Sequence, residues 1–264
     1  MSRSEEVPLV LRLLDHQVVG PHGELLGNID DLVLREAGDE LEVVAFMSGP
    51  AGLARRQGGR GGRWLHAAWA RLHPQEHPRP VVVPLTEVTR VGSAVEVSAR
   101  AAEVLAGSAG LELWLRQHVV GRLPGARDGD PSTGGAPMRR RGLLPEAYLL
   151  QEGDHTTSEL VGSRATVGGR DLGSVIEVLA APRGRRGGPW GRLVLTDLVC
   201  SRRRLGAELG YTMSAQGPRL VELAMRVWHR HDQRVDLRHV DIAWTDRRLQ
   251  VSGAARLRHP RDVG

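Results

Sequence analysis

The sequence contains no lysine, a single cysteine and very few aromatic residues. All 36 basic residues are arginines, and with 31 acidic residues they give a formal net charge of +5. Abundant Gly, Ala, Arg and Pro are typical of a GC-rich genome, so much of the arginine content reflects codon choice. A net charge of this size gives only mild long-range attraction to polyanions. Nucleic-acid binding is therefore possible but not favoured.

The lone cysteine and the short apolar runs exclude several classes of protein. Cys200 has no second cysteine with which it could form an internal disulfide. The first residues lack the basic start, apolar core and cleavage site of a secretory signal. Apolar runs such as PLVL and VVVPL are far shorter than the roughly 18 residues of a membrane-spanning helix. We expect a cytoplasmic protein without a membrane span, with peripheral membrane contact left open.

An internal repeat organises the chain. The stretch GELLGNIDDLV begins at Gly23, and GRDLGSVIEVL begins 146 residues later at Gly169. In each stretch, the first glycine supplies the positive φ of a hairpin turn, and the second lies where a strand bends or another backbone comes close. The aligned pairs are Gly23 with Gly169, Leu26 with Leu172, Gly27 with Gly173, Ile29 with Val175, Asp31 with Glu177 and Leu32 with Val178.

Each copy also ends with a predicted hairpin, in VVVPLTEVTRVGSAVEVS (residues 81–98) and in VDLRHVDIAWTDRRLQVS (residues 235–252). Alternating apolar residues flank two-residue turns at positions 92–93 and 246–247. This alignment places Val88 on Ile242, Val95 on Leu249 and Val97 on Val251.

Between its two hairpins, each copy has a further strand, an Arg/Gly loop and a short helix. The strands are LEVVAFM from Leu41 and GRLVLTDLVC from Gly191. The helices have apolar stripes at helical spacing within residues 65–72 and 220–227.

Five or six strands and one helix in a copy of about 95 residues favour a small closed or nearly closed β-barrel, because closure removes exposed strand edges. We therefore predict a mainly β protein with some α-helix. Its expected parts are a first barrel (residues 7–98), a connecting helix (99–124), a flexible linker (125–157) and a divergent second barrel (158–254). Because repeated units tend to bury equivalent faces, we also expect pseudo-twofold packing of the two copies.

The repeated motifs resemble those of the PRC-barrel family. The first copy carries LLDHQVVGPHGELLGNIDDLVL and VVVPLTEV, and the second, more divergent copy carries ELVGSRATVGGRDLGSVIEVL and RVDLRHVDIAW. The chain looks in particular like the tandem PRC-barrel proteins of high-GC actinobacteria, in which a VGRLPGA helix end, here at positions 120–126, joins the barrels.

The family resemblance implies an interaction module and supplies no catalytic residues. Its members include a ribosome maturation factor that binds a small-subunit protein and the H subunit of photosynthetic reaction centres. This chain lacks the membrane helix of the H subunit and the separate N-terminal domain of the maturation factor. Neither of these functions therefore transfers to it.

Histidine and cysteine are the candidates for metal binding and nucleophilic catalysis. His229, His231 and His239 could ligate a metal together with neighbouring aspartates, but their positions at a helix end and in the following loop fit ordinary polar residues better. Cys200 ends an apolar run and is expected to be an inert buried side chain. No nucleophile elbow or phosphate-binding loop is present. We expect no cofactor and no enzymatic activity.

Tryptophan and clustered arginine are the candidates for partner binding, since both are common at binding hot spots. The alternative is that the tryptophans plug the barrels and the arginines lie in solvated loops. The candidate residues are Trp64, Trp69, Trp114, Trp228, Arg202, Arg203 and Arg204.

The leading hypothesis is a non-enzymatic adaptor that binds a protein partner or a second copy of itself. The alternatives are an RNA- or ribosome-associated factor that uses the arginine-rich loops, and a metal or small-molecule sensor.

Overall fold

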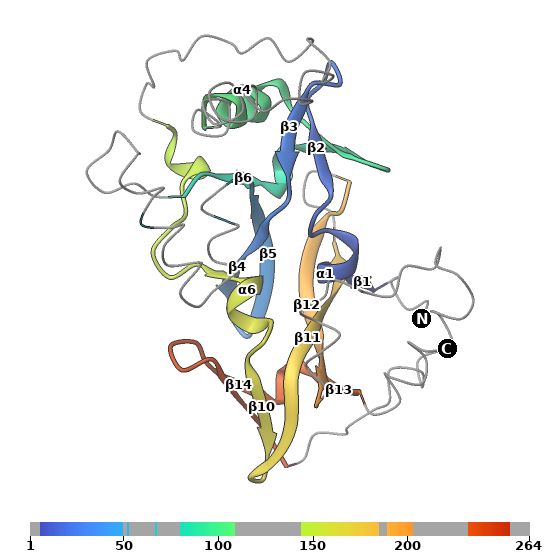
Figure 1. The fold of residues 1–264 in the computed structure, drawn as a ribbon, viewed down its shortest axis with the longest axis vertical. Helices are drawn as coiled ribbons and strands as arrows, with labels where there is room; N and C mark the ends of the chain where they lie inside the picture. Colours follow the sequence, from blue (N-terminus) through green and yellow to red (C-terminus); the bar gives the residue numbers. More distant parts are fainter. Residues whose placement is uncertain are drawn as a thin grey trace, which may run out of the picture.

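The structure is a computed structural model, and it describes residues 6–49, 52, 67, 80–108, 144–184, 189–202 and 232–253. The predicted helices within residues 65–72 and 220–227 lie outside this part, apart from the single position 67. So does the stretch from 109 to 143, which holds the rest of the expected connecting helix and most of the expected linker. The described part is mainly β, as predicted, with a curled open sheet, a second small sheet and few helices (Figure 1).

The first copy contains seven strands and one 3-10 helix among its described residues. These elements are β2 (Gln17–Val19), β3 (Leu25–Asn28), β4 (Asp31–Ala37), β5 (Glu40–Met47), β6 (Val82–Pro84), η1 (Leu85–Glu87), β7 (Val88–Val91) and β8 (Val95–Val97). The small sheet has the order β3-β2-β8-β7. β4, β5 and β6 belong to the large sheet.

The second copy repeats this order of elements. They are β10 (Arg164–Val167), β11 (Arg170–Arg183), β12 (Arg192–Ser201), β13 (Gln233–Asp236), η5 (Leu237–His239), β14 (Val240–Ala243) and β15 (Arg248–Val251). The long strand β11 occupies the positions that correspond to both β3 and β4 of the first copy. All strands of the second copy therefore remain in the large sheet.

The strand pairings also repeat, which confirms the repeat that the sequence predicts. β2 pairs with β8 in parallel, as β10 pairs with β15, and antiparallel pairs join β7 to β8 and β14 to β15. In the view of Figure 1, β2 and β3 lie at the upper end of the molecule, and β10 and β14 lie at the lower end.

Both glycines of the repeated motif have the conformations that their positions require. Gly23 and Gly169 each turn a hairpin with φ of +81°. Gly27 and Gly173 have φ of +129° and +100°. A Cβ on Gly27 would meet Ser48 Oγ at 2.7 Å, and one on Gly173 would overlap the backbone carbonyl of Ser201. The second glycine is therefore the position at which another part of the chain approaches closely.

The closing hairpins differ from the prediction in their turns. Three residues separate β7 from β8 and four separate β14 from β15, whereas the sequence suggested two in each. Val88 pairs with Val97 and Val240 pairs with Val251, so Val88 corresponds to Val240 and the alignment with Ile242 was wrong by two residues. The extra residue in the second turn accounts for one position of this shift, and the β-bulge between Val88 and Arg90 in the first hairpin accounts for the other.

Helix α4 (Ala99–Ser108) follows β8, where the connecting helix was expected to begin. Ser98 caps it, because its hydroxyl accepts a hydrogen bond from the amide of Ala101 at 3.2 Å. Within the range 125–157 that the sequence suggested as a linker, residues 144–157 pack into the fold. They include the 3-10 helix η4 (Glu146–Tyr148), in which Tyr148 is buried.

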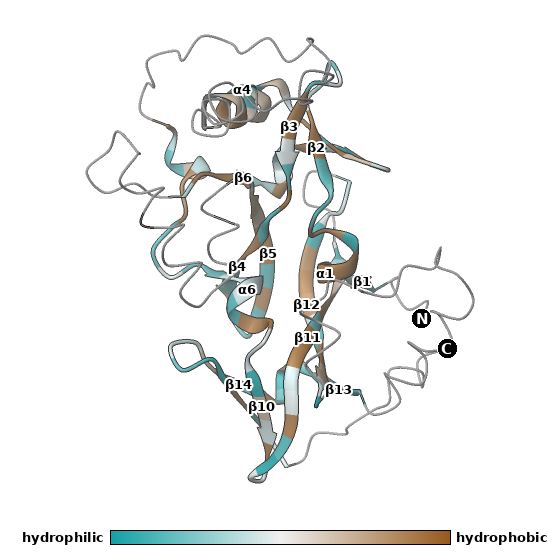
Figure 2. Cartoon of the chain, in the orientation of Figure 1, coloured by the Kyte–Doolittle hydropathy of each residue, from teal (hydrophilic) through white to brown (hydrophobic). Residues whose placement is uncertain are grey.

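One hydrophobic core extends through both copies. Phe46 and Val18 of the first copy belong to the same buried cluster as Val178 and Leu198 of the second. Figure 2 shows hydrophobic residues along the strands of both copies, whereas the turn of the β10–β11 hairpin is hydrophilic. At the centre, β5 pairs with β12 antiparallel, with Val43 opposite Leu193. The two copies therefore share both a core and a sheet.

Candidate functional site

Each copy is preceded by a short segment that binds to the other copy. We call residues 6–12 and residues 154–160 the lead-in segments. The first contains β1 (Val7–Pro8) and helix α1 (Leu9–Arg12), and the second contains β9 (His155–Thr156) and helix α6 (Thr157–Leu160). β1 pairs with β11 of the second copy, and β9 pairs with β4 of the first. The exchange is reciprocal, as pseudo-twofold packing of the two copies requires.

The registers of the two exchanged strands are equivalent. Val7 lies opposite Ala180, and His155 lies opposite Leu34, at the position that the 146-residue repeat relates to Ala180. We call slot two the edge of β11 that pairs with the first lead-in segment, together with the side chains that contact this segment. Slot one is the corresponding edge of β4, which pairs with the second lead-in segment, together with the side chains that contact that segment. Both slots hold a two-residue strand followed by one helical turn.

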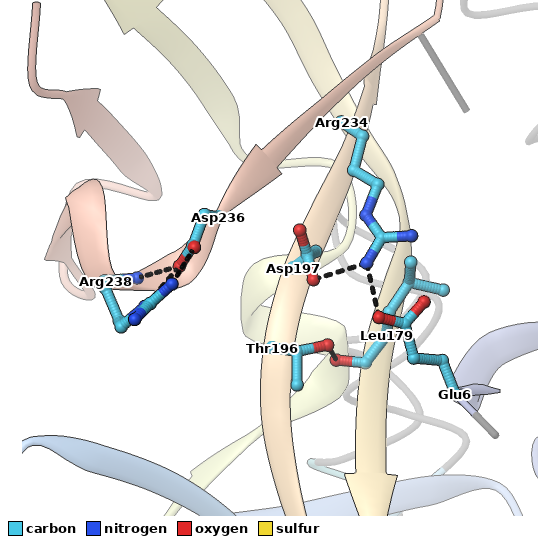
Figure 3. Close-up of polar contacts among 7 residues, drawn as sticks. All are labelled: Glu6, Leu179, Thr196, Asp197, Arg234, Asp236 and Arg238. Carbon is cyan, nitrogen blue, oxygen red and sulfur yellow. Dashed lines mark hydrogen bonds and ion pairs between the residues drawn. The ribbon is translucent and has the colours of Figure 1, made fainter. Parts of the chain in front are cut away.

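An acidic residue begins each lead-in segment and forms an ion pair in its slot. In slot two, Arg234 Nη2 donates to Glu6 at 2.6 Å and to Asp197 at 2.7 Å (Figure 3). In slot one, Arg35 donates through Nε and Nη2 to the two carboxylate oxygens of Asp154, at 2.7 and 2.9 Å. Burial differs between the slots, since the side chain of Arg234 is 7% exposed and that of Arg35 is 48% exposed.

A carboxylate of each copy, fully buried at Asp31 and partly buried at Glu177, binds the short helix of the other copy's lead-in segment. Glu177 accepts hydrogen bonds from the amides of Val10 at 2.8 Å and Leu11 at 3.0 Å. Asp31 accepts them from the amide of Ser158 at 3.1 Å and from the hydroxyls of Thr157 and Ser158, both at 2.5 Å. The first amides of a helix lack partners inside the helix, so these carboxylates satisfy otherwise unpaired donors.

Burial raises the pKa of both carboxyl groups above their ordinary values, and the hydrogen bonds that they accept oppose this shift. Asp31 is fully buried. The sequence aligned Asp31 with Glu177, but it gave no sign that each carboxylate reaches a segment in the other copy.

Ion pairs also cross the central seam between β5 and β12. Glu40 accepts from Arg183 and from Arg192, each at 2.7 Å, and Arg192 also pairs with the buried Glu42. The hydrogen bonds to Arg192 raise its pKa further, with Glu42 as the largest cause. Together with the exchanged segments, these contacts make the two copies one unit.

Most predicted partner-binding and metal-binding residues lie outside the described part of the chain. They are Trp64, Trp69, Trp114, Trp228, Arg203, Arg204, His229 and His231. The described residues of those sets are Arg202 and His239. Arg202 is exposed and donates to the carbonyl oxygen of Asp171 through Nε at 3.0 Å and Nη2 at 2.6 Å. This arginine therefore ties the end of β12 to the start of β11.

His239 is exposed at the end of η5. Among the residues that the structure describes, no three His, Cys, Asp or Glu side chains gather as a metal-binding group. His239 and the described aspartates near it are thus not brought together as a ligand set.

The described arginines are mostly engaged within the protein. Of thirteen, seven form ion pairs with carboxylates, two donate to backbone carbonyls and one lies over an aromatic ring. The ion-paired arginines are Arg35, Arg90, Arg164, Arg183, Arg192, Arg234 and Arg238. Over this part of the chain, arginine therefore supports the fold more than it offers free charge to a polyanion.

Sequence reasoning missed a stacked aromatic pair near slot one. The rings of His155 and Trp244 stack with centroids 3.7 Å apart and planes 5° from parallel. His155 Nδ1 lies 3.1 Å from a carboxylate oxygen of Glu159. Beside them, Arg247 donates to the carbonyls of Ser158 and Val161, both at 2.7 Å. These contacts fix the β14–β15 turn against α6, and no spacing in the sequence connects the two.

Cys200 is buried on β12, and burial raises the pKa of its thiol to about 12, with a further contribution from the charge of Asp232. Since the thiolate is the reactive form, we expect the folded protein to resist a thiol-modifying reagent such as dithionitrobenzoate at pH 8. The denatured protein should react with one equivalent. Rapid modification of the folded protein would contradict this prediction.

None of the helices in the described part of the chain is long and apolar enough to span a bilayer. A scan against protein-family models and a search of curated proteins give no match to this chain.

Proposed function

We propose that the protein is a non-enzymatic adaptor that binds a protein partner by capturing an extended segment of it. One observation carries this proposal: the fold already binds two extended protein segments of its own, one in each slot, through strand pairing, an ion pair and a capped helical turn. Such backbone pairing at a sheet edge is a general mode of peptide recognition.

We further propose that the two copies are PRC-like barrels of the tandem actinobacterial type, joined by a helix that begins with α4, and that the protein acts in the cytoplasm. The pairings among β10, β11, β12 and β15 of the second copy repeat the pairings among the corresponding strands of the first copy. This similarity supports a common barrel-like unit. The shared core and the paired β5 and β12 support a rigid adaptor with two equivalent halves.

A tagged pull-down from a cytoplasmic extract, with and without nuclease and analysed by mass spectrometry, tests the adaptor proposal. We expect a defined protein partner that is retained after nuclease treatment. Recovery only of RNA and ribosomal proteins that nuclease removes would favour the RNA-associated alternative and overturn the proposal. The solution mass of the purified protein, measured in parallel, shows whether the partner is a second copy of the chain.

A further inference from the structure

The two slots hold different sequences in the same way. Slot two holds EVPLVLR, and slot one holds DHTTSEL. These segments share an acidic first residue, two extended residues and one turn of helix, but their side chains after the acidic residue differ in polarity at almost every position. The features that the two bound segments share are therefore the backbone conformation and the acidic first residue.

Slot two holds its segment with fewer polar contacts than slot one. Asp154 accepts hydrogen bonds from both Nε and Nη2 of Arg35, whereas Glu6 accepts one from Nη2 of Arg234. The side chain of Asp154 is 3% exposed, and that of Glu6 is 29% exposed. Asp31 accepts three hydrogen bonds from the segment in slot one, and Glu177 accepts two from the segment in slot two. Slot two should therefore release its segment more readily.

Arg234 also has binding capacity that Glu6 does not use. Its Nε is buried and has no hydrogen-bond partner among the residues that the structure describes, while its Nη2 donates to both Glu6 and Asp197. The equivalent pair in slot one uses Nε together with Nη2. A carboxylate that accepted hydrogen bonds from both Nε and Nη2 of Arg234 would form a bidentate ion pair, which is stronger than the single hydrogen bond.

We infer that slot two is the docking site for the partner, and that a partner segment displaces residues 6–12 from it. The segment that fits has an acidic residue, two extended residues that pair with Leu179 and Ala180, and a helical turn that begins with a leucine-sized apolar residue. The apolar requirement follows from Leu9, which is fully buried at the start of α1. This inference rests on the proposed adaptor function, and it specifies where and what the adaptor binds.

Binding of a fluorescently labelled peptide with the sequence of residues 4–14 to the full chain tests the inference. In the Glu6→Ala chain, the chain's own segment loses its ion pair but slot two is intact. We expect this chain to bind the peptide about tenfold more tightly than the wild-type chain does, because an ion-paired hydrogen bond of the competing segment is lost. The Glu36→Ala chain, changed at an exposed residue of β4, should bind as the wild type does.

A peptide in which the acidic residue at the position of Glu6 is replaced by alanine should bind at least about tenfold more weakly to the Glu6→Ala chain. Equal affinity of the two peptides, or no binding of either peptide to a folded Glu6→Ala chain, would overturn the inference. Circular dichroism of each chain establishes that it is folded.

A reversible cross-link provides a second test that does not depend on weakening the fold. Val7 and Ala180 are opposite each other in the β1–β11 pair, so the Val7→Cys/Ala180→Cys chain should close slot two with a disulfide. The buried Cys200 should not interfere. The partner recovered in the pull-down should be lost at least about tenfold on oxidation and regained on reduction.

A matched control closes the other slot through Leu34→Cys/His155→Cys, and the partner should remain bound to this chain. If the partner also remains on the oxidised Val7→Cys/Ala180→Cys chain, the adaptor proposal stands and slot two is not the docking site. If no protein partner is captured by the wild-type chain either, the adaptor proposal itself fails.

Discussion

Replacing Gly173 with alanine should destabilise the protein more than any other single methyl addition that we consider. Gly173 has φ of +100°, and a Cβ there would overlap the carbonyl of Ser201, which is backbone and cannot rotate away. Since Gly173 pairs with Ala165 of β10 and the next residue, Ser174, pairs with Ser201 of β12, relief requires the sheet to shift. We expect a loss of at least about 4 kcal/mol in the free energy of unfolding, measured by urea titration.

The matched control for this prediction is Gly169→Ala in the turn between β10 and β11. Gly169 has φ of +81°, but a Cβ there would meet nothing within 4 Å. The cost is then only that of the left-handed conformation, about 1–2 kcal/mol. Similar losses for the two substitutions would show that close approach at Ser201 is not what requires glycine at Gly173.

Gly169 and Gly173 belong to the part of the fold that could be predicted from the sequence alone. Hairpin turns and alternating strands have local signatures, so the repeat, β5 and β12 were predicted correctly. Loop length was harder, because apolar residues alternate equally well in two registers two residues apart. That ambiguity is why Val88 was matched to Ile242 rather than to Val240.

The candidate site could not be predicted because its parts carry no local signal. β1 and β9 are two residues long, which is too short for a periodic pattern, and α1 and α6 are single turns. The contact between Glu177 and Val10 joins residues 167 positions apart. The alignment of Asp31 with Glu177 was the one available clue, since acidic residues at equivalent positions of two apolar strands indicate a shared polar role.

The second large expected effect is a loss of stability in the Asp31→Ala chain, because Asp31 holds the helix of a lead-in segment as Glu177 does. The substitution leaves the amide of Ser158 and the hydroxyls of Thr157 and Ser158 without their buried acceptor. Unpaired buried donors each cost about 1–3 kcal/mol, partly relieved where a hydroxyl can rotate. We therefore expect the free energy of unfolding to fall by about 3 kcal/mol at pH 7, measured by urea titration. A loss below about 0.5 kcal/mol would mean that Asp31 does not hold the lead-in segment.

The Asp31→Asn chain separates hydrogen bonding from charge, because asparagine keeps an acceptor and does not titrate. Burial raises the folded-state pKa of Asp31 above its ordinary value of 3.8. The pH-dependent part of the stability that Asp31 contributes is therefore fully present below about pH 3.8 and is lost as the pH rises through the folded-state pKa, whereas the hydrogen bonds that Asp31 accepts still contribute at pH 7. We expect the stability deficit of Asp31→Asn relative to wild type to be largest near pH 4 and to shrink toward pH 7. A deficit that instead grows with pH would show that the ionised carboxylate is the form that the fold prefers.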